Sequence, residues 1–181
     1  MRVIGGKYRH RLLSWPSDVE HIRPTKDRIR EAIFNALNNI EGLKSLDLYS
    51  GSGSMGIESL SRGCSFCTFV DINKIALKTT SDNLKSLNIN KNEYEIIPLE
   101  DMKALAQFKT NKQVFDLIFL DPPYKEGKYQ EVISYILDNS LISEKGIIVV
   151  ESDHEIDFDS QAFRLVKKYT YGEIKVWILW R

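Results

Sequence analysis

The sequence predicts an α/β fold, with one domain built on a central and mostly parallel sheet of about seven strands. From residue 44 onward, short apolar segments alternate with segments of helical periodicity, and the apolar segments show little in–out alternation. That pattern is typical of parallel strands covered by helices on both faces. Two β-rich runs, residues 163–169 and 173–180, flank Tyr171-Gly172 and predict an antiparallel hairpin that closes the sheet.

The expected elements follow one another in a regular order. Strands are expected over residues 44–49, 66–72, 94–98, 114–120 and 146–151, and helices over residues 56–61, 73–87, 101–108 and 129–137. Ahead of them, residues 2–4 and 9–13 predict a small hairpin that Gly5-Gly6 interrupts. A helix with Thr25 as its N-cap follows, and its apolar residues recur at helical spacing.

Composition excludes several classes of protein. The chain has 181 residues, of which 43% are hydrophobic and 28% charged, as in an ordinary globular domain. The longest apolar run, residues 176–180, is far shorter than the ~20 residues that span a bilayer. The basic start of the chain lacks the apolar stretch of a signal peptide, and there are only two cysteines. We therefore expect a cytoplasmic protein with no membrane partner.

The neutral net charge hides an uneven distribution. The first 30 residues contain eight basic and three acidic side chains, whereas the rest contains 17 basic and 22 acidic ones. A basic end on an acidic body indicates contact with a polyanion, although an ordinary solvated basic surface has the same pattern. We expect a basic hairpin extension over residues 1–22, followed by the main domain over residues 23–181. The candidate contacts to a polyanion are Arg2, Lys7, Arg9, Arg11, Arg23 and Arg28.

A glycine-rich loop joins the first main strand to its helix. Gly51, Gly53 and Gly56 spell G-x-G-x-x-G, which lets the backbone turn sharply and approach a ligand at the edge of the sheet. Asp71 ends the next strand, 20 residues after Gly51, where its carboxylate can accept both hydroxyls of an adenosine ribose. Such a loop fits two cofactors, NAD and S-adenosylmethionine (SAM).

Two carboxylates favour SAM. Asp47 precedes the loop, where it suits the ammonium-bearing end of SAM and would oppose a pyrophosphate. Asp101 follows the third strand, where it can accept a hydrogen bond from an adenine amino group, act as a helix N-cap, or both. The expected cofactor site comprises Asp47, Ser50, Gly51, Gly53, Gly56, Asp71, Ile72, Asp101 and Met102.

The motif D-P-P-Y, residues 121–124, follows the apolar fourth strand. Pro122 and Pro123 have no N–H groups, so backbone carbonyls can point into a site without competing donors. Asp121 and the Pro122 carbonyl can together accept both hydrogens of an exocyclic amine, while Tyr124 offers a flat face for stacking. We expect these four residues to support direct methyl transfer to the amine without a metal. The proton goes to Asp121 or to water.

These motifs carry a resemblance to a known family. The segments RVIGGKYRHRLL, IRPTKDRIREAIFNAL, LDLYSGSGSMGIESLSRG, FVDIN, FDLIFLDPPY and YGEIKVWILW resemble the bacterial 16S rRNA guanine-N2 methyltransferases. The resemblance runs from the start nearly to the C-terminus. It implies a Rossmann-like class I SAM-dependent methyltransferase with S-adenosylhomocysteine as product. It also implies methylation of a guanine N2 in 16S rRNA, within an assembled or assembling small ribosomal subunit.

Other interpretations stay open at this point. An adenine-N6 methyltransferase would use the same motifs, an RNA-binding assembly factor would keep the fold without catalysis, and an NAD-dependent oxidoreductase would share the glycine loop. The pair Cys64 and Cys67 is expected to be structural, because one C-x-x-C cannot complete a four-thiolate zinc site. The three tryptophans are expected to be packing residues, and Glu151 is either a site residue or a surface charge at a strand end.

Overall fold

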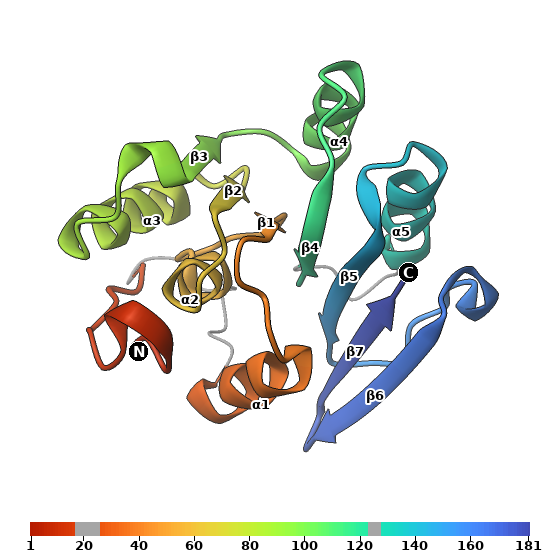
Figure 1. The fold of residues 1–181 in the computed structure, drawn as a ribbon, viewed down its shortest axis with the longest axis horizontal. Helices are drawn as coiled ribbons and strands as arrows, with labels where there is room; N and C mark the ends of the chain where they lie inside the picture. Colours follow the sequence, from red (N-terminus) through yellow and green to blue (C-terminus); the bar gives the residue numbers. More distant parts are fainter. Residues whose placement is uncertain (17–25, 123–127) are drawn as a thin grey trace.

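The computed structural model describes residues 1–16, 26–122 and 128–181 and contains a seven-stranded sheet in the order β3-β2-β1-β4-β5-β7-β6 (Figure 1). Neighbouring strands from β3 to β5 are parallel, and β7 is antiparallel to both β5 and β6, as predicted. The strands are β1 (Lys44–Asp47), β2 (Phe66–Val70), β3 (Tyr94–Ile97), β4 (Phe115–Leu120), β5 (Ile142–Ser152), β6 (Leu165–Tyr171) and β7 (Ile174–Trp180). The strand order reverses between β1 and β4, where open α/β sheets bind their ligands.

Five α-helices flank the sheet within the described residues. They are α1 (Asp27–Leu37), α2 (Ser54–Ser61), α3 (Lys74–Ser86), α4 (Asp101–Thr110) and α5 (Tyr129–Asp138). The expected helix over residues 101–108 continues to Thr110, and the expected strand over residues 146–151 already begins at Ile142. The predicted N-cap of the first helix, Thr25, lies outside the described residues, and Lys26 occupies the N-cap position instead.

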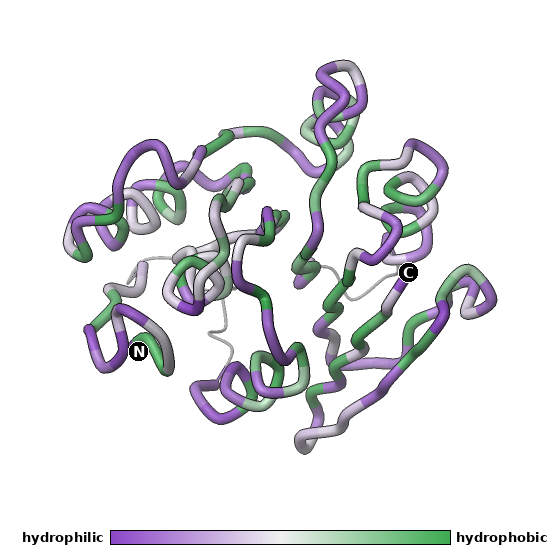
Figure 2. Tube along the Cα trace, in the orientation of Figure 1, coloured by the Kyte–Doolittle hydropathy of each residue, from purple (hydrophilic) through white to green (hydrophobic). Residues whose placement is uncertain are grey.

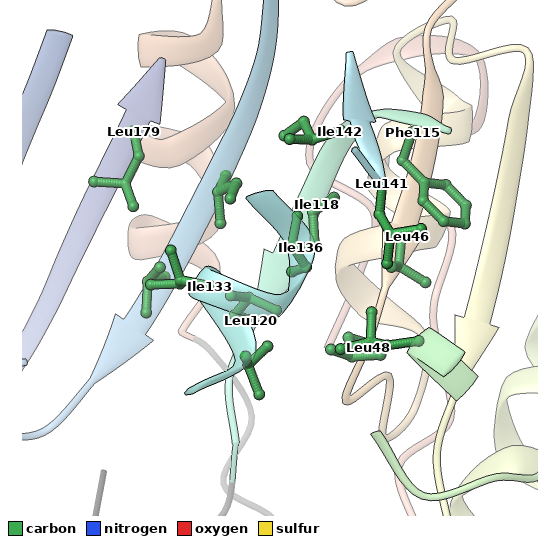
Figure 3. Packing of buried hydrophobic residues seen from close by; sticks show 14 of the residues in the cluster. Leu46, Leu48, Phe115, Ile118, Leu120, Ile133, Ile136, Leu141, Ile142 and Leu179 are labelled. Atoms are coloured by element: carbon green, nitrogen blue, oxygen red, sulfur yellow. The ribbon is translucent and has the colours of Figure 1, made fainter. Parts of the chain in front are cut away.

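The central strands are buried on both faces, which explains the missing in–out alternation in their sequence. On one face, Ile133 and Ile136 of α5 belong to the same cluster as Ile118 of β4, and Figure 3 shows them side by side. On the other face, Leu117 and Phe119 of β4 belong to a cluster with α1. Figure 2 shows hydrophobic stretches along the central strands and hydrophilic stretches on the outer helices and turns.

The N-terminal segment folds back on itself as predicted, but it contains no β-strands. Residues 1–16, which we call the N-terminal arm, contain one isolated antiparallel bridge between Arg2 and Leu12 and a 3-10 helix at Gly6–Tyr8. The expectation of two β-strands is wrong because this segment packs against helices and its turn is compact. Gly6 has φ +73°, and a Cβ there would lie 1.7 Å from the Ser61 carbonyl oxygen.

The arm is fastened to α2 by buried polar groups. Glu58, which is 1% exposed, accepts the backbone N–H of Ile4 at 2.7 Å and that of Gly5 at 2.8 Å. The Ser61 hydroxyl accepts the Tyr8 N–H at 2.9 Å. Because α2 begins at the glycine loop, the arm and the loop are anchored to one helix. The boundary expected between residues 22 and 23 lies outside the described residues.

Candidate active site

The glycine loop between β1 and α2 has the backbone geometry that its sequence predicts. Gly53 adopts φ +79°, a left-handed conformation that L side chains rarely adopt. At Gly56 a Cβ would lie 2.3 Å from Cε1 of Phe69, so only glycine fits between α2 and β2. The backbone of the loop can therefore approach a ligand closely at the carboxyl edge of the sheet.

Asp47 lies under this loop at the end of β1. Its side chain is 4% exposed, and its Oδ2 accepts the Gly56 N–H at 2.9 Å. Burial raises the pKa of the Asp47 carboxyl to about 7, although the bond from Gly56 acts in the opposite direction. A cation brought beside Asp47 would stabilise the charged form of this group.

Asp71 follows β2 and faces the other side of the glycine loop. One of its carboxylate oxygens accepts the Gly51 N–H at 2.8 Å, and the other accepts the Asn73 N–H at 2.8 Å. Asp71 is half-buried, so its oxygens retain room for further donors. The next residue, Ile72, is 68% exposed and offers an apolar surface beside the carboxylate.

Asp101 is buried at the start of α4. The N-cap position belongs to Glu100, so the expectation that Asp101 is the N-cap is wrong. One Asp101 oxygen accepts the Met102 N–H at 2.7 Å, and the other accepts the Tyr49 hydroxyl at 2.7 Å. Tyr49 thus links the end of β1 to the start of α4, a contact that no local sequence pattern revealed.

A pocket opens between the carboxyl ends of β1, β4 and β5 and brings Asp47, the glycine loop and Asp121 together. It is lined by Trp15, Ile33, Asp47, Tyr49, Ser50, Gly51, Ser52, Ser54, Met55, Phe119, Leu120, Asp121, Val149 and Glu151. The other expected cofactor residues do not line it. They are Gly53 and Gly56, at the end of the glycine loop and the start of α2, and Asp71, Ile72, Asp101 and Met102, beyond the ends of β2 and β3.

Asp121 stands at the end of β4 with its side chain exposed. The surrounding protein nevertheless desolvates its carboxyl group, and the negative charges of Glu151, Asp47 and Asp153 act in the same direction. Together they raise the pKa of Asp121 well above its usual value. Pro122 is buried. The rest of the D-P-P-Y motif, Pro123 and Tyr124, lies outside the described residues.

Several residues that line the pocket were not among the predicted site residues, and Glu151 and Trp15 are two of them. Glu151, left open between a site residue and a surface charge, lines the pocket from β5. A signal for it exists, because parallel strands end at one edge and Glu151 ends an apolar strand as Asp121 does. Trp15 was expected to be a packing residue but lines the same pocket from the arm. No local pattern places a residue of the arm there.

The pocket fits a polar ligand. The hydroxyls of Ser50 and Ser52 are buried and have no hydrogen-bond partner among the described residues. Buried polar groups are normally paired, so two such orphans on one loop indicate a ligand that pairs them. Ser50 was predicted as a cofactor-binding residue, whereas Ser52 was not.

The basic residues of the arm and of the start of α1 divide into two groups. Arg2, Arg9, His10 and Arg28 line a second hollow together with Val3, Ile4, Asp27 and Glu31. Lys7 lies over the Tyr8 ring at 5.1 Å, and Arg11 donates to the Ser86 carbonyl at 2.8 Å, so neither lines that hollow. Arg23 lies outside the described residues.

The two cysteines are buried free thiols. Burial raises the pKa of Cys64 to about 11 and that of Cys67 well above its usual value, which keeps both protonated and unreactive. Within the described parts of the chain, no group of three His, Cys, Asp or Glu side chains could hold a metal ion. Across those same parts, no helix has the length and apolar character needed to cross a membrane.

The sheet order, the glycine loop after β1 and the acidic residues after β1 and β2 define a Rossmann-like class I methyltransferase, the class whose cofactor is SAM. Residues 1–180 match the family described as "Conserved hypothetical protein 95", and the chain belongs to this family. The structure of "Putative methyltransferase yhhF from Escherichia coli" superimposes with a TM-score of 0.83 and 26% identity, covering 100% of this chain and 97% of that one.

Curated relatives carry names of the same kind. "Putative rRNA methyltransferase YlbH" of Bacillus subtilis is 38% identical over 175 residues, covering 95% of this chain and 94% of the relative. "Ribosomal RNA small subunit methyltransferase D" of Escherichia coli K12 is 34% identical over 156 residues, covering 86% of this chain and 76% of the relative.

Proposed function

We propose that this protein transfers the methyl group of SAM to the exocyclic N2 of a guanine in 16S ribosomal RNA, within an assembled or assembling small subunit. The observation that carries the proposal is a single pocket in which Asp47 and the glycine loop lie beside Asp121. The names of the curated relatives support rRNA as the substrate. The guanine N2 target rests on the resemblance carried by the D-P-P-Y motif and the N-terminal segments.

Residues on both sides of the glycine loop hold the cofactor. Asp71 accepts the ribose hydroxyls, Asp101 accepts the adenine amino group, and the side chains of Ile72 and Met102 contact the adenine ring. Asp47 and Ser50 hold the amino-acid end, together with the backbone of Gly51, Gly53 and Gly56. SAM supplies a methyl group activated by a positively charged sulfonium. The protein contributes alignment and exclusion of water around the reacting atoms.

Asp121 and Pro122 hold the amine to be methylated. The carboxylate and the Pro122 carbonyl accept its two hydrogens, Pro123 keeps the turn rigid, and Tyr124 stacks on the base. Formation of the N–C bond would accompany breaking of the bond between the methyl carbon and sulfur, with S-adenosylhomocysteine as leaving group, and the nitrogen would lose one proton. The raised pKa of Asp121 makes its carboxylate a suitable acceptor for that proton, which then passes to water.

The test is to incubate the protein with methyl-labelled SAM and small subunits from cells that lack its gene, and then to identify the labelled nucleoside by mass spectrometry. We expect N2-methylguanosine. Labelled N6-methyladenosine would instead establish the rival activity.

Asp121→Asn tests the assigned acceptor residue. It should lower turnover about 10²–10⁴-fold, the range for one acid–base group, and change SAM affinity much less than turnover. Asp138→Asn, on the exposed end of α5, is the matched control. If Asp121→Asn had the same turnover as the control, the D-P-P-Y segment would have only a structural role as a turn.

A further inference from the structure

The N-terminal arm contributes a residue, Trp15, to the lining of the pocket. Its half-buried side chain lines the pocket that Asp47 and Asp121 share. The other lining residues come from α1, the glycine loop and the carboxyl ends of β1, β4 and β5. A side chain of the arm therefore lies where the cofactor and the acceptor meet.

A buried amide fixes the position of Trp15. Asn83 of α3 is 2% exposed, and its Oδ1 accepts the Ser14 N–H at 2.7 Å. Its Nδ2 donates to the Ser14 carbonyl at 3.1 Å and to the Ser52 carbonyl at 3.0 Å. One side chain thus joins the residue before Trp15 to the glycine loop. This arrangement fixes the backbone next to Trp15 relative to the loop, and the indole lines the same pocket as the loop.

The pocket has the chemistry of a cation site. Its described lining includes the three carboxyl groups of Asp47, Asp121 and Glu151, three aromatic side chains and no Lys or Arg. The face of an indole attracts a cation, and more strongly than other aromatic side chains do. SAM carries two positive charges at one end, the ammonium and the sulfonium. The residues expected around its adenosine, Asp71 and Asp101, do not line this pocket.

We propose that Trp15 is a cofactor-binding residue whose indole contacts the positively charged end of SAM, and that Asn83 is the positioning residue that holds it there. The assignment goes beyond the proposed function, because it holds for any methyl acceptor. SAM and S-adenosylhomocysteine differ in charge at sulfur, so Trp15 should favour binding of SAM over binding of the product.

The experiment measures the affinity of the full chain for SAM and for S-adenosylhomocysteine by calorimetry. Trp15→Leu keeps an apolar side chain but removes the aromatic face. It should weaken SAM binding by about threefold to thirtyfold, the range for one cation–π contact, and weaken S-adenosylhomocysteine binding clearly less. Trp15→Phe should have an intermediate effect, and Asn83→Ala should reproduce the selective loss. Trp180→Leu, on β7 at the other end of the sheet, is the matched control.

Tryptophan fluorescence gives a second readout that needs no RNA. Added S-adenosylhomocysteine should change the emission of the native chain and of Trp180→Phe, and the change should disappear in Trp15→Phe. If Trp15→Leu does not fold, the ratio of SAM affinity to S-adenosylhomocysteine affinity in Trp15→Phe tests the proposal instead. An unchanged ratio, or equal losses for both ligands, would overturn the proposal. If the labelled nucleoside were not N2-methylguanosine, the proposed function would be contradicted, but the assignment of Trp15 to SAM binding would stand.

Discussion

The Asp71 carboxylate accepts the backbone N–H of Gly51 at 2.8 Å, although 20 residues separate the two in the chain. The same carboxylate also accepts the Asn73 N–H at the start of α3. Asp71 therefore ties the glycine loop to the end of β2 before any ligand arrives. Its proposed role in ribose binding adds to this structural one.

Asp71→Ala should weaken SAM binding at least tenfold, because hydrogen bonds to a charged group contribute about 1.5–3 kcal/mol. The fold should survive, since the residue is half-buried at a loop. Calorimetry with SAM and circular dichroism check the two halves of this prediction. Asp82→Ala, on the exposed face of α3, is the control. A well-folded Asp71→Ala protein with the control's affinity would remove Asp71 from the site.

Asp47→Asn should make the protein more stable and bind SAM more weakly. The pKa of Asp47 is about 7 in the fold, against a usual value of 3.8, so burial of the charged form costs stability. An asparagine oxygen can still accept the Gly56 N–H, while the attraction to an ammonium is lost. Thermal unfolding and calorimetry of the variant measure the two effects.

The gain in stability of Asp47→Asn should depend on pH. Between about pH 4 and pH 7 the folded chain holds a proton on Asp47 that the unfolded chain releases, so native stability falls as pH rises. The advantage of the variant should grow through this window, by up to about 1.4 kcal/mol for each unit of pKa shift, and level off above it. A difference independent of pH would show that Asp47 is ionised normally in the fold.

Glu58→Ala should destabilise the protein severely. Glu58 accepts two N–H groups of the arm, pairs with Arg62 at 2.7 Å, and lies 3.9 Å from the fully buried Arg30. Removing one partner of a buried ion pair typically costs about 3–5 kcal/mol, because the other charge stays buried. Urea unfolding compares it with Glu131→Ala on the exposed face of α5. Equal stabilities would mean that the arm does not depend on α2.

The exposed basic residues of the arm should set the salt dependence of RNA binding. Changing both Lys7 and Arg9 to Gln should make the slope of log affinity against log salt shallower by about 1.4, at roughly 0.7 per phosphate contact. SAM affinity should not change, since neither residue lines the cofactor pocket. The matched control changes two exposed lysines to Gln, namely Lys112 before β4 and Lys145 on β5. A wild-type slope in the arm variant would place the RNA elsewhere.

Local patterns in the sequence predicted the secondary structure well because each element carries its own signal. The apolar strands, the helical spacing of α1 and the glycine turn after β1 are all readable within about ten residues. The arm was predicted less well. Its short segments have β-like composition, but Gly6 packs against α2, and that contact favours a compact turn over a pair of strands.

The site was predictable where strand ends carry polar residues. Asp47 is the last residue of β1, Asp71 and Asp121 directly follow β2 and β4, and parallel strands end at a common edge. Trp15 escaped prediction because its place depends on Asn83, which lies 69 residues beyond Ser14 in the chain. The contact of Tyr49 was not predicted for the same reason, because its partner Asp101 lies 52 residues further along the chain.

The fold class, the glycine loop and the acidic residues at the strand ends are readable in the amino-acid sequence, because they follow from short-range periodicity and the direction of parallel strands. The contacts between distant segments are visible only in the folded chain. In the fold, Trp15 of the arm and Glu151 line one pocket with the glycine loop, and the hydroxyls of Ser50 and Ser52 are buried with no hydrogen-bond partner among the described residues. These features depend on packing between distant segments, whose geometry is set by the assembled core and by buried polar contacts that no local pattern specifies.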